Sequence, residues 1–287
     1  MESFFDCKPL GSADINTYFA KIKTKGAGSF GKVYTARVTP EGKASIGTDL
    51  PDIVAVKAVK ITGLSPEEVD ILRNEISVLK ALRVPHGITY YGCFQNSLYL
   101  YLIMELIDGQ ELYDCIVNDI LSADEKLVIV REIALGIKEF HDAGLIHRDI
   151  KPENIMIVRQ PTLRVVIIDY GFVCNIGKPQ DGCTRDMGSP GYHDGLALKG
   201  NFDSMKLGDW WALGQIMSIM IANVILYNER TEKYANLTER ALYIANVPHL
   251  LHDIILGLTR TDIPQERRPT EAAIIGALVA VTDKIKL

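Results

Sequence analysis

Four polar residues surround a predicted β-hairpin in the second half of the chain. Two apolar runs at residues 155–158 and 163–168 flank a turn at residues 160–162, which predicts two antiparallel strands. Loops at neighbouring ends of these strands carry an acid, an amine, an amide and a second acid: Asp149, Lys151, Asn154 and Asp169. Because paired strands bring such loops together, we expect these side chains to converge.

The four side chains suit one kind of chemistry. Asp149 can accept a proton from a hydroxyl nucleophile, and Lys151 can neutralise charge on a phosphoryl group during its transfer. Asn154 and Asp169 offer the hard oxygen ligands that Mg²⁺ prefers. The alternative is a surface loop that happens to be polar. Independent motifs elsewhere in the chain, which agree in order and spacing, disfavour it.

The residues around this hairpin resemble a known family. The run from His147 to Asn154 resembles the catalytic loop of eukaryotic-type protein kinases, and residues 169–171, Asp-Tyr-Gly, resemble their metal-binding triplet. The resemblance implies ATP and Mg²⁺ as cofactors and a Ser/Thr hydroxyl of a protein as the acceptor. Lys151, two residues after Asp149, and Ser189 both favour the serine/threonine branch.

The resemblance also implies an α+β, bilobal fold, with a small β-rich N-lobe that holds one key helix and a larger helical C-lobe. Its implied parts are an N-terminal extension (1–17), an N-lobe (18–104), a hinge (105–109) and a C-lobe (110–287). A mostly β segment followed by a mostly helical one independently predicts two lobes with a ligand cleft between them.

A glycine-rich stretch lies between two predicted strands, residues 18–24 and 33–38. Its glycines let backbone N–H groups approach a phosphate closely. By itself this pattern fits an ordinary hairpin equally well. A strand follows it, so a dinucleotide-binding unit, which needs a helix there, is disfavoured. The nucleotide contacts that the resemblance implies here are Gly26, Ala27, Gly28, Ser29, Phe30, Gly31 and Val33.

A strand predicted at residues 53–59 contains one lysine, Lys57, and the resemblance implies that it holds the α- and β-phosphates beside Ala55. A helix predicted from Ser65 to about Leu82 begins with a capping box. Glu75 falls on the apolar face of this helix, and the resemblance implies that it forms an ion pair with Lys57. The alternative is a solvated acid. Between the two strands, residues 39–51 are rich in Gly, Pro, Ser and Thr and predict a loop.

The remaining nucleotide contacts follow from the resemblance. Met104 guards the back of the adenine pocket or is an ordinary core methionine, and both can hold. The other implied contacts are Glu105 and Leu106 through their backbone, Glu111 at the ribose, and Met156, with Asn154 and Asp169 as metal ligands. Asp209 is expected to accept hydrogen bonds from the backbone near His147 and hold the catalytic loop.

The long irregular segment after Asp169 predicts a regulatory element. Thr184 is the predicted phosphosite, modified by an upstream kinase or by autophosphorylation, with Arg148 as a charge partner of the phosphate. The alternative is an unmodified loop threonine. Residues 194–196 read Asp-Gly-Leu where the family has Ala-Pro-Glu. The resemblance implies that the family's glutamate pairs with Arg268; here that partner is lost or moved, with Asp194 as the candidate replacement. This departure keeps a pseudokinase scaffold as the alternative function.

Composition limits the partners. The chain has 287 residues, is 47% hydrophobic and 23% charged, and carries a net charge of −5, which argues against nucleic-acid binding. Residues 210–227 predict a buried helix, with no membrane span. The chain opens without a secretory signal pattern. The chain has five scattered cysteines without Cys-x-x-Cys spacing: Cys7, Cys93, Cys115, Cys174 and Cys183. This pattern predicts a reduced, intracellular protein, either cytoplasmic or nuclear.

Overall fold

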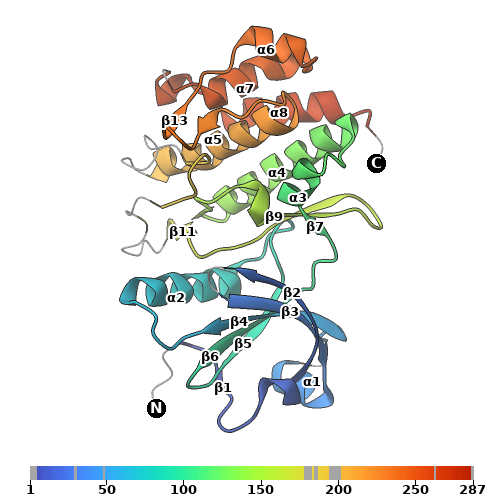
Figure 1. Ribbon diagram of the computed structural model, residues 1–287, viewed down its shortest axis with the longest axis vertical. Coiled ribbons are helices and arrows are strands. Elements are labelled where there is room, and N and C mark those ends of the chain that lie inside the picture. The colour runs from blue at the N-terminus through green and yellow to red at the C-terminus, as the bar shows by residue number, and fades with distance from the viewer. Residues whose placement is uncertain are drawn as a thin grey trace. The chain divides into compact units, whose positions relative to one another are not determined.

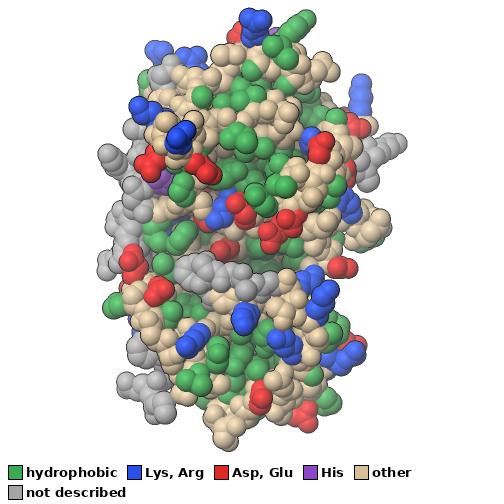
Figure 2. Space-filling view, in the orientation of Figure 1, with side chains coloured by type: hydrophobic (Ala, Val, Ile, Leu, Met, Phe, Trp, Pro, Cys, Tyr) green, Lys and Arg blue, Asp and Glu red, His purple; other side chains and the backbone are tan. Residues whose placement is uncertain are grey.

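The structure is a computed structural model, and it describes residues 5–28, 31–47, 49–177, 183, 187–193, 202–261 and 263–285. The chain divides into two compact units. The first comprises residues 1–83 and 88–108, and the second comprises residues 84–87 and 109–287 (Figure 1). Acidic and basic side chains both appear on the visible face of each unit (Figure 2).

The first unit is built on a six-stranded sheet in the order β1-β5-β6-β4-β3-β2. Neighbouring strands are antiparallel, except that β1 runs parallel to β5. The strands are β1 (Lys8–Pro9), β2 (Phe19–Gly28), β3 (Gly31–Val38), β4 (Ile53–Lys60), β5 (Tyr90–Gln95) and β6 (Tyr99–Met104). Alternate residues of the central strands enter a buried apolar core that includes Phe19, Val54 and Phe94.

Two helices and one short 3₁₀ turn accompany this sheet: η1 (Ile15–Thr17), α1 (Pro40–Ile46) and α2 (Pro66–Ala81). The predicted capping box of α2 is present, because Ser65 and Glu68 exchange side chain–backbone hydrogen bonds. The predicted loop at residues 39–51 was wrong over α1. Thr39 caps that helix by accepting from the N–H of Gly42, and Pro40 stands at its first turn. These start signals outweigh the loop-forming composition.

The second unit is mainly helical. Its helices are α3 (Leu112–Val117), α4 (Ala123–Asp142), α5 (Phe202–Met220), α6 (Glu239–Ile244), α7 (His252–Thr259) and α8 (Glu271–Thr282), with 3₁₀ turns η2 (Pro152–Asn154), η5 (His249–Leu251) and η6 (Gln265–Arg267). Its strands are β7 (Gln110–Glu111), β8 (Leu145–Ile146), β9 (Ile155–Val158), β10 (Arg164–Ile167), β11 (Cys174–Asn175), β12 (Tyr227–Asn228) and β13 (Lys233–Tyr234). The predicted hairpin is present as antiparallel β9 and β10.

Helix α5 forms much of this unit's core. Residues 210–220 are helical and mostly buried, as predicted, but the helix ends at Met220 and Tyr227 lies in β12. A Cβ atom placed on Gly214 would lie 2.7 Å from the Cβ of Leu258, so glycine at this position lets α5 and α7 approach closely. Within the part of the chain that the structure describes, no helix is long and apolar enough to cross a membrane.

The segment 84–87 joins the second unit through a buried histidine. His86 places Nδ1 2.9 Å from Glu139 and Nε2 3.2 Å from Glu132, both on α4. Burial lowers the pKa of His86, but hydrogen bonds to Glu132 and Glu139 outweigh it and leave the pKa raised. The charged imidazole is therefore favoured between the two carboxylates.

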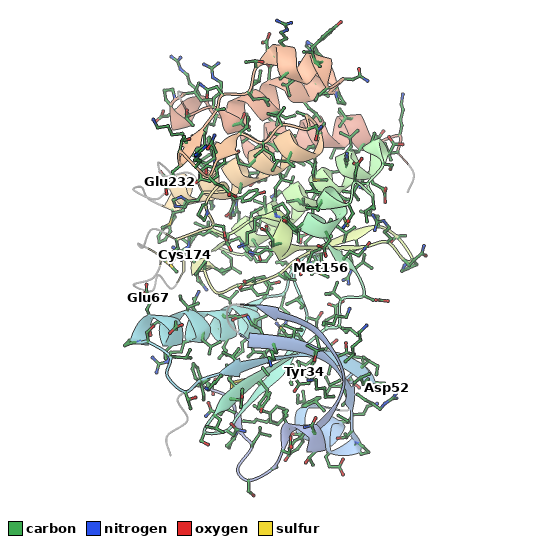
Figure 3. The ribbon with its side chains drawn as sticks, in the orientation of Figure 1. Tyr34, Asp52, Glu67, Met156, Cys174 and Glu232 are labelled. Carbon is green, nitrogen blue, oxygen red and sulfur yellow. A yellow bond between two sulfur atoms is a disulfide. The ribbon has the colours of Figure 1, made fainter. Side chains whose placement is uncertain are left out.

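The prediction of reduced cysteines was wrong for four of the five. Cys7 is bonded to Cys93 and Cys174 to Cys183, and only Cys115 is free and buried. The first pair is 86 residues apart in sequence and meets because β1 pairs with β5. Spacing alone does not reveal such a meeting. Figure 3 labels Cys174, which lies in the short strand β11.

Candidate active site

The catalytic-loop segment and the triplet after β10 both contain backbone conformations that side chains rarely adopt. Arg148 has a φ of 66° and Asp169 a φ of 67°, both in the left-handed region. Each such residue costs of order 1–3 kcal/mol and persists only when its surroundings hold it in place. Strain of this kind marks sites where side-chain direction matters more than local stability.

Asp209 on α5 holds the loop at this strained point. Its two carboxylate oxygens accept the backbone N–H groups of His147 and Arg148 at 2.9 and 2.8 Å, as the sequence predicted. Nε2 of His141, on α4, lies 2.9 Å from the same carboxylate. Burial raises the pKa of Asp209, but the interactions with His141 and His147 outweigh it, so the pKa is lowered and the anion is retained.

His141 was missed in the sequence analysis. It occupies the last turn of α4 and is 5% exposed, facing Asp209 across the helix packing. The available signal was a histidine on the apolar face of a helix, next to the predicted loop. That signal is weak, because a histidine at such a position is usually only a packed core residue.

The Asp149 carboxylate is contacted by three donors from two parts of the second unit, the turn η2 with its N-cap Lys151 and the segment around Ser189. Oδ1 accepts the backbone N–H of Ser189 at 2.9 Å, and Oδ2 accepts Nδ2 of Asn154 at 2.9 Å. Nζ of Lys151 lies 3.2 Å from Oδ2 and donates to the Ser189 hydroxyl at 2.6 Å. Three of the four side chains expected to converge, those of Asp149, Lys151 and Asn154, therefore lie together, with Ser189 beside them. Charge-assisted bonds of this number leave the carboxylate little rotational freedom.

Asn154 is oriented for a second task. Its Nδ2 group donates to both the side chain and the backbone oxygen of Asp149, at 2.9 and 2.8 Å. With its donors used there, the amide oxygen remains as an acceptor or ligand atom. The backbone oxygen of Asn154 accepts the N–H of Ile168, the residue before Asp169. Amide and carboxylate oxygens such as those of Asn154 and Asp169 are ligand types that fit Mg²⁺.

Tyr170 stands next to Asp169 and is 1% exposed. Its ring centroid lies 6.0 Å from that of His147 and 5.7 Å from that of Phe140. The hydroxyl donates to the backbone oxygen of Ile167 at 2.5 Å. The ring thus packs against His147 and Phe140, and the buried hydroxyl has the partner that burial requires.

Arg148 makes contacts that the sequence did not reveal. Its Nε donates to the backbone oxygen of Phe172 at 2.7 Å and its Nη1 to that of Cys183 at 3.2 Å. Burial lowers the pKa of this guanidinium. Its proposed phosphate partner, Thr184, lies outside the described residues, as do residues 194–196. Arg268 is buried with its guanidinium 5.1 Å from the ring centroid of Trp211.

The first unit contains the other predicted charged pair. Nζ of Lys57 on β4 lies 2.6 Å from Oε1 of Glu75 on α2, and the side chains are only 14% and 6% exposed. The expected ion pair is therefore present, and the alternative of a solvated glutamate is wrong. The pair joins the sheet to α2, so the position of this helix determines where the Lys57 ammonium lies.

Close packing between strands explains one glycine of the glycine-rich stretch, Gly31. Gly31 has a φ of 147°, and a Cβ atom there would lie 2.3 Å from the backbone oxygen of Ala58. Only glycine fits this close approach of β3 to β4. The backbones of Gly26 and Gly28 pair with Val33 and Gly31 across the hairpin. Ser29 and Phe30 lie outside the described residues.

The remaining predicted contacts lie in both units. Ala55 pairs with Met104 between β4 and β6 in the first unit. The N–H of Glu105 donates to the oxygen of Thr89 at 2.8 Å, so a ligand contact by the Glu105 backbone would use its carbonyl oxygen. Leu106 follows it before the first unit ends at Asp108.

In the second unit, Glu111 pairs with Met156 between β7 and β9. Figure 3 labels Met156, which is half-buried. Burial, followed by the nearby charges of Asp114 and Glu153, raises the pKa of Glu111.

Comparison with known proteins identifies the family. The model of the protein kinase domain matches residues 19–273, so the chain belongs to the protein kinase family. It is 28% identical to myosin light chain kinase family member 4 of Homo sapiens over 73% of this chain and 52% of that protein. It is 31% identical to CBL-interacting serine/threonine-protein kinase 8 of Arabidopsis thaliana over 72% of this chain and 44% of that protein.

A third relative is the calcium/calmodulin-dependent protein kinase type 1 of Caenorhabditis briggsae, 31% identical over 74% of this chain and 57% of that protein. The chain thus spans about half the length of the curated relatives that it matches. The predicted fold class is confirmed, with a β-sheet N-terminal unit and a helical C-terminal unit.

Proposed function

We propose that this protein is a serine/threonine protein kinase, which transfers the γ-phosphoryl group of MgATP to a Ser or Thr hydroxyl of a protein. The observation that supports this most directly is the Asp149 carboxylate, fixed at 2.9 Å by both Ser189 and Asn154. A carboxylate held in one orientation can align a hydroxyl group and accept its proton. Lys151, 3.2 Å away, supplies positive charge at the same place.

The proposal gives the other residues supporting parts. Lys57, held by Glu75, binds the α- and β-phosphates, with Ala55, Val33 and the glycine-rich stretch close by. Asn154 and Asp169 hold Mg²⁺, whose chemical contribution when bound is to neutralise charge on the phosphate oxygens. Glu105, Leu106, Glu111 and Met156 line the nucleoside. Catalysis by these residues is mainly positioning and electrostatic stabilisation.

Replacing one oxygen atom of Asp149 tests the proposal. Asp149→Asn keeps the shape and an acceptor oxygen but removes the base, so transfer to a generic protein substrate should fall at least about a hundredfold. Binding of MgATP should survive. The matched control is Asp253→Asn, an exposed aspartate on α7, which should transfer phosphate like the wild type. Equal rates for Asp149→Asn and the wild type would overturn the role of Asp149.

The sequence at residues 194–196 favours the second candidate, a pseudokinase that binds ATP as a scaffold. Wild-type protein that binds MgATP but transfers no phosphate to any peptide of an arrayed library would establish this alternative. A labelled peptide would exclude it and would also indicate the substrate class.

Regulation and location belong to the same proposal. Phosphorylation of Thr184, by an upstream kinase or by autophosphorylation, would place a charge one residue after Cys183, whose carbonyl already accepts from Arg148. Intact mass of the purified protein, with and without ATP, tests this. We also propose an intracellular location. The two disulfides of the protein are unusual for a reducing compartment. Counting the free thiols of protein extracted from cells in the presence of an alkylating agent therefore tests that location.

A further inference from the structure

Residues 5–10 precede the kinase-family match and form an N-terminal strap on the first unit. Phe5 and Leu10, at its two ends, are 3% and 5% exposed. Between them, β1 pairs in parallel with β5, and the N–H of Leu10 donates to the oxygen of Gln95 at 2.8 Å. The strap is therefore buried at its two ends, whereas Asp6, Lys8 and Pro9 between them are exposed. A two-residue edge strand is nevertheless a weak attachment by itself.

A covalent bond reinforces this attachment. Cys7 in the strap is bonded to Cys93 of β5, with their Cα atoms 5.0 Å apart. The bond keeps the backbone of neighbouring Asp6 beside the sheet, where Sγ of Cys93 lies 3.5 Å from the Asp6 carbonyl oxygen. The disulfide thus determines where the polar groups of Asp6 are presented.

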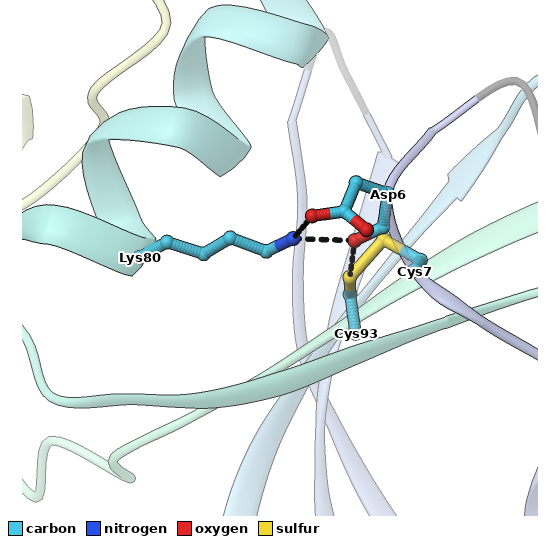
Figure 4. The surroundings of a disulfide bond; sticks show 4 residues. All are labelled: Asp6, Cys7, Lys80 and Cys93. Carbon is cyan, nitrogen blue, oxygen red and sulfur yellow. Dashed lines mark hydrogen bonds and ion pairs between the residues drawn. A yellow bond between two sulfur atoms is a disulfide. The ribbon is translucent and has the colours of Figure 1, made fainter.

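Those polar groups contact α2. Nζ of Lys80, in the last turn of the helix, donates to both the carboxylate and the backbone oxygen of Asp6, each at 2.5 Å (Figure 4). The Asp6 side chain is 99% exposed, and a free ion pair of this kind would contribute little. The cross-link changes that situation, because Asp6 is already held in place and Lys80 alone has to be ordered.

Helix α2 also carries Glu75, the partner of Lys57. Glu75 lies five residues before Lys80, or about 7.5 Å along the helix axis at 1.5 Å per residue. A helix is rigid over this length, so an anchor at Lys80 restricts how far Glu75 can move from Lys57. The Lys57–Glu75 distance of 2.6 Å is the one that this anchor would preserve.

We propose that the N-terminal strap, cross-linked by Cys7–Cys93, is a positioning element for α2, and that Asp6 and Lys80 are positioning residues for the Lys57–Glu75 pair. The consequence for nucleotide binding rests on the proposed kinase function. The consequence for α2 does not, because it concerns only how tightly the strap holds the helix. The two consequences can therefore be measured separately.

The first experiment measures hydrogen–deuterium exchange of α2 in the full chain. Lys80→Met and Cys7→Ser should each raise exchange around Glu75 at least about fivefold, since local opening governs the rate. Lys80→Arg keeps the positive charge and should leave α2 as protected from exchange as in the wild type. Two controls should leave α2 unchanged: Lys60→Met, an exposed lysine at the end of β4, and Cys183→Ser, which breaks the other disulfide. Unchanged exchange in both Lys80→Met and Cys7→Ser would overturn the proposal.

The second experiment is a double-mutant cycle on the affinity for adenylyl imidodiphosphate with Mg²⁺. Lys80→Met should weaken binding about three- to tenfold, the range expected for a residue that acts through another. In the Glu75→Gln background it should have no further effect, because the pair that it positions is gone. Independent, additive effects of the two changes would contradict the proposed route.

The two experiments also separate the failure of this inference from the failure of the proposed function. Wild-type protein that binds no nucleotide would remove the kinase proposal, while α2 exchange would still decide the role of the strap. Normal nucleotide binding in Lys80→Met and Cys7→Ser, with the wild type binding well, would show that the strap does not position the Lys57–Glu75 pair and would leave the kinase proposal intact. Should Cys7→Ser fail to fold, Lys80→Met alone decides.

Discussion

Removing the Asp209 carboxylate should destabilise the second unit strongly. The side chain is 1% exposed and accepts from the backbone of His147 at 2.9 Å and Arg148 at 2.8 Å, with His141 2.9 Å away. In Asp209→Ala all three lose their acceptor at a buried place. Each unsatisfied group costs about 1–3 kcal/mol, so three of them cost at least about 3 kcal/mol together. We therefore expect a loss of about 3–5 kcal/mol in the free energy of unfolding.

The position of the two tryptophans makes this measurable. Trp210 and Trp211 are the only tryptophans of the chain and follow Asp209 directly on α5. Their fluorescence during urea denaturation reports on the second unit, and Asp203→Ala, an exposed aspartate at the start of the same helix, is the control. The control should stay within about 0.5 kcal/mol of the wild type. A loss below about 1 kcal/mol in Asp209→Ala would refute the reasoning.

The same variant should also release the strained loop. Without Asp209, nothing described from α5 holds the amides of His147 and Arg148, and the left-handed conformation of Arg148 becomes costly to keep. Hydrogen exchange at residues 147–149 should therefore rise more than exchange in α8. Equal rises in the two places would indicate general unfolding instead.

Three further outcomes are expected. The pKa of His86 is raised in the folded protein, so the protonated histidine contributes its full stabilisation below the unfolded pKa of about 6.5, and this contribution is lost as pH rises through the folded pKa. His86→Gln should remove this part of the pH dependence of the free energy of unfolding. Persistence of that dependence would place its origin elsewhere. Lys57→Met should slow phosphoryl transfer at least about a hundredfold, and circular dichroism should show that the first unit is still folded. If the variant unfolds at the assay temperature, the role of Lys57 is structural instead. Tyr170→Phe loses the hydrogen bond from the hydroxyl to the Ile167 carbonyl, so the free energy of unfolding should fall by about 0.5–1.5 kcal/mol. Turnover should change less than about threefold.

Local sequence signals determined most of the site. The capping boxes at Ser65 and Ser122 place α2 and α4, and the β9–β10 hairpin places Asp149 and Asn154, because these signals act over a few residues. The Lys57–Glu75 pair was predicted from the family resemblance. The place of Glu75 on the apolar face of its helix agreed with that prediction, because a glutamate there needs a cation.

Only the tertiary structure decided the long-range contacts. The pairing of Cys7 with Cys93, the place of His86 between two glutamates of α4, and the approach of His141 to Asp209 join residues between about 46 and 86 positions apart. Helix α1 shows the opposite failure, in which loop-forming composition hid a correct cap at Thr39. Period and capping act between near neighbours and can be recognised from residue order. Which distant side chains meet depends on how the elements pack, and no local pattern encodes that.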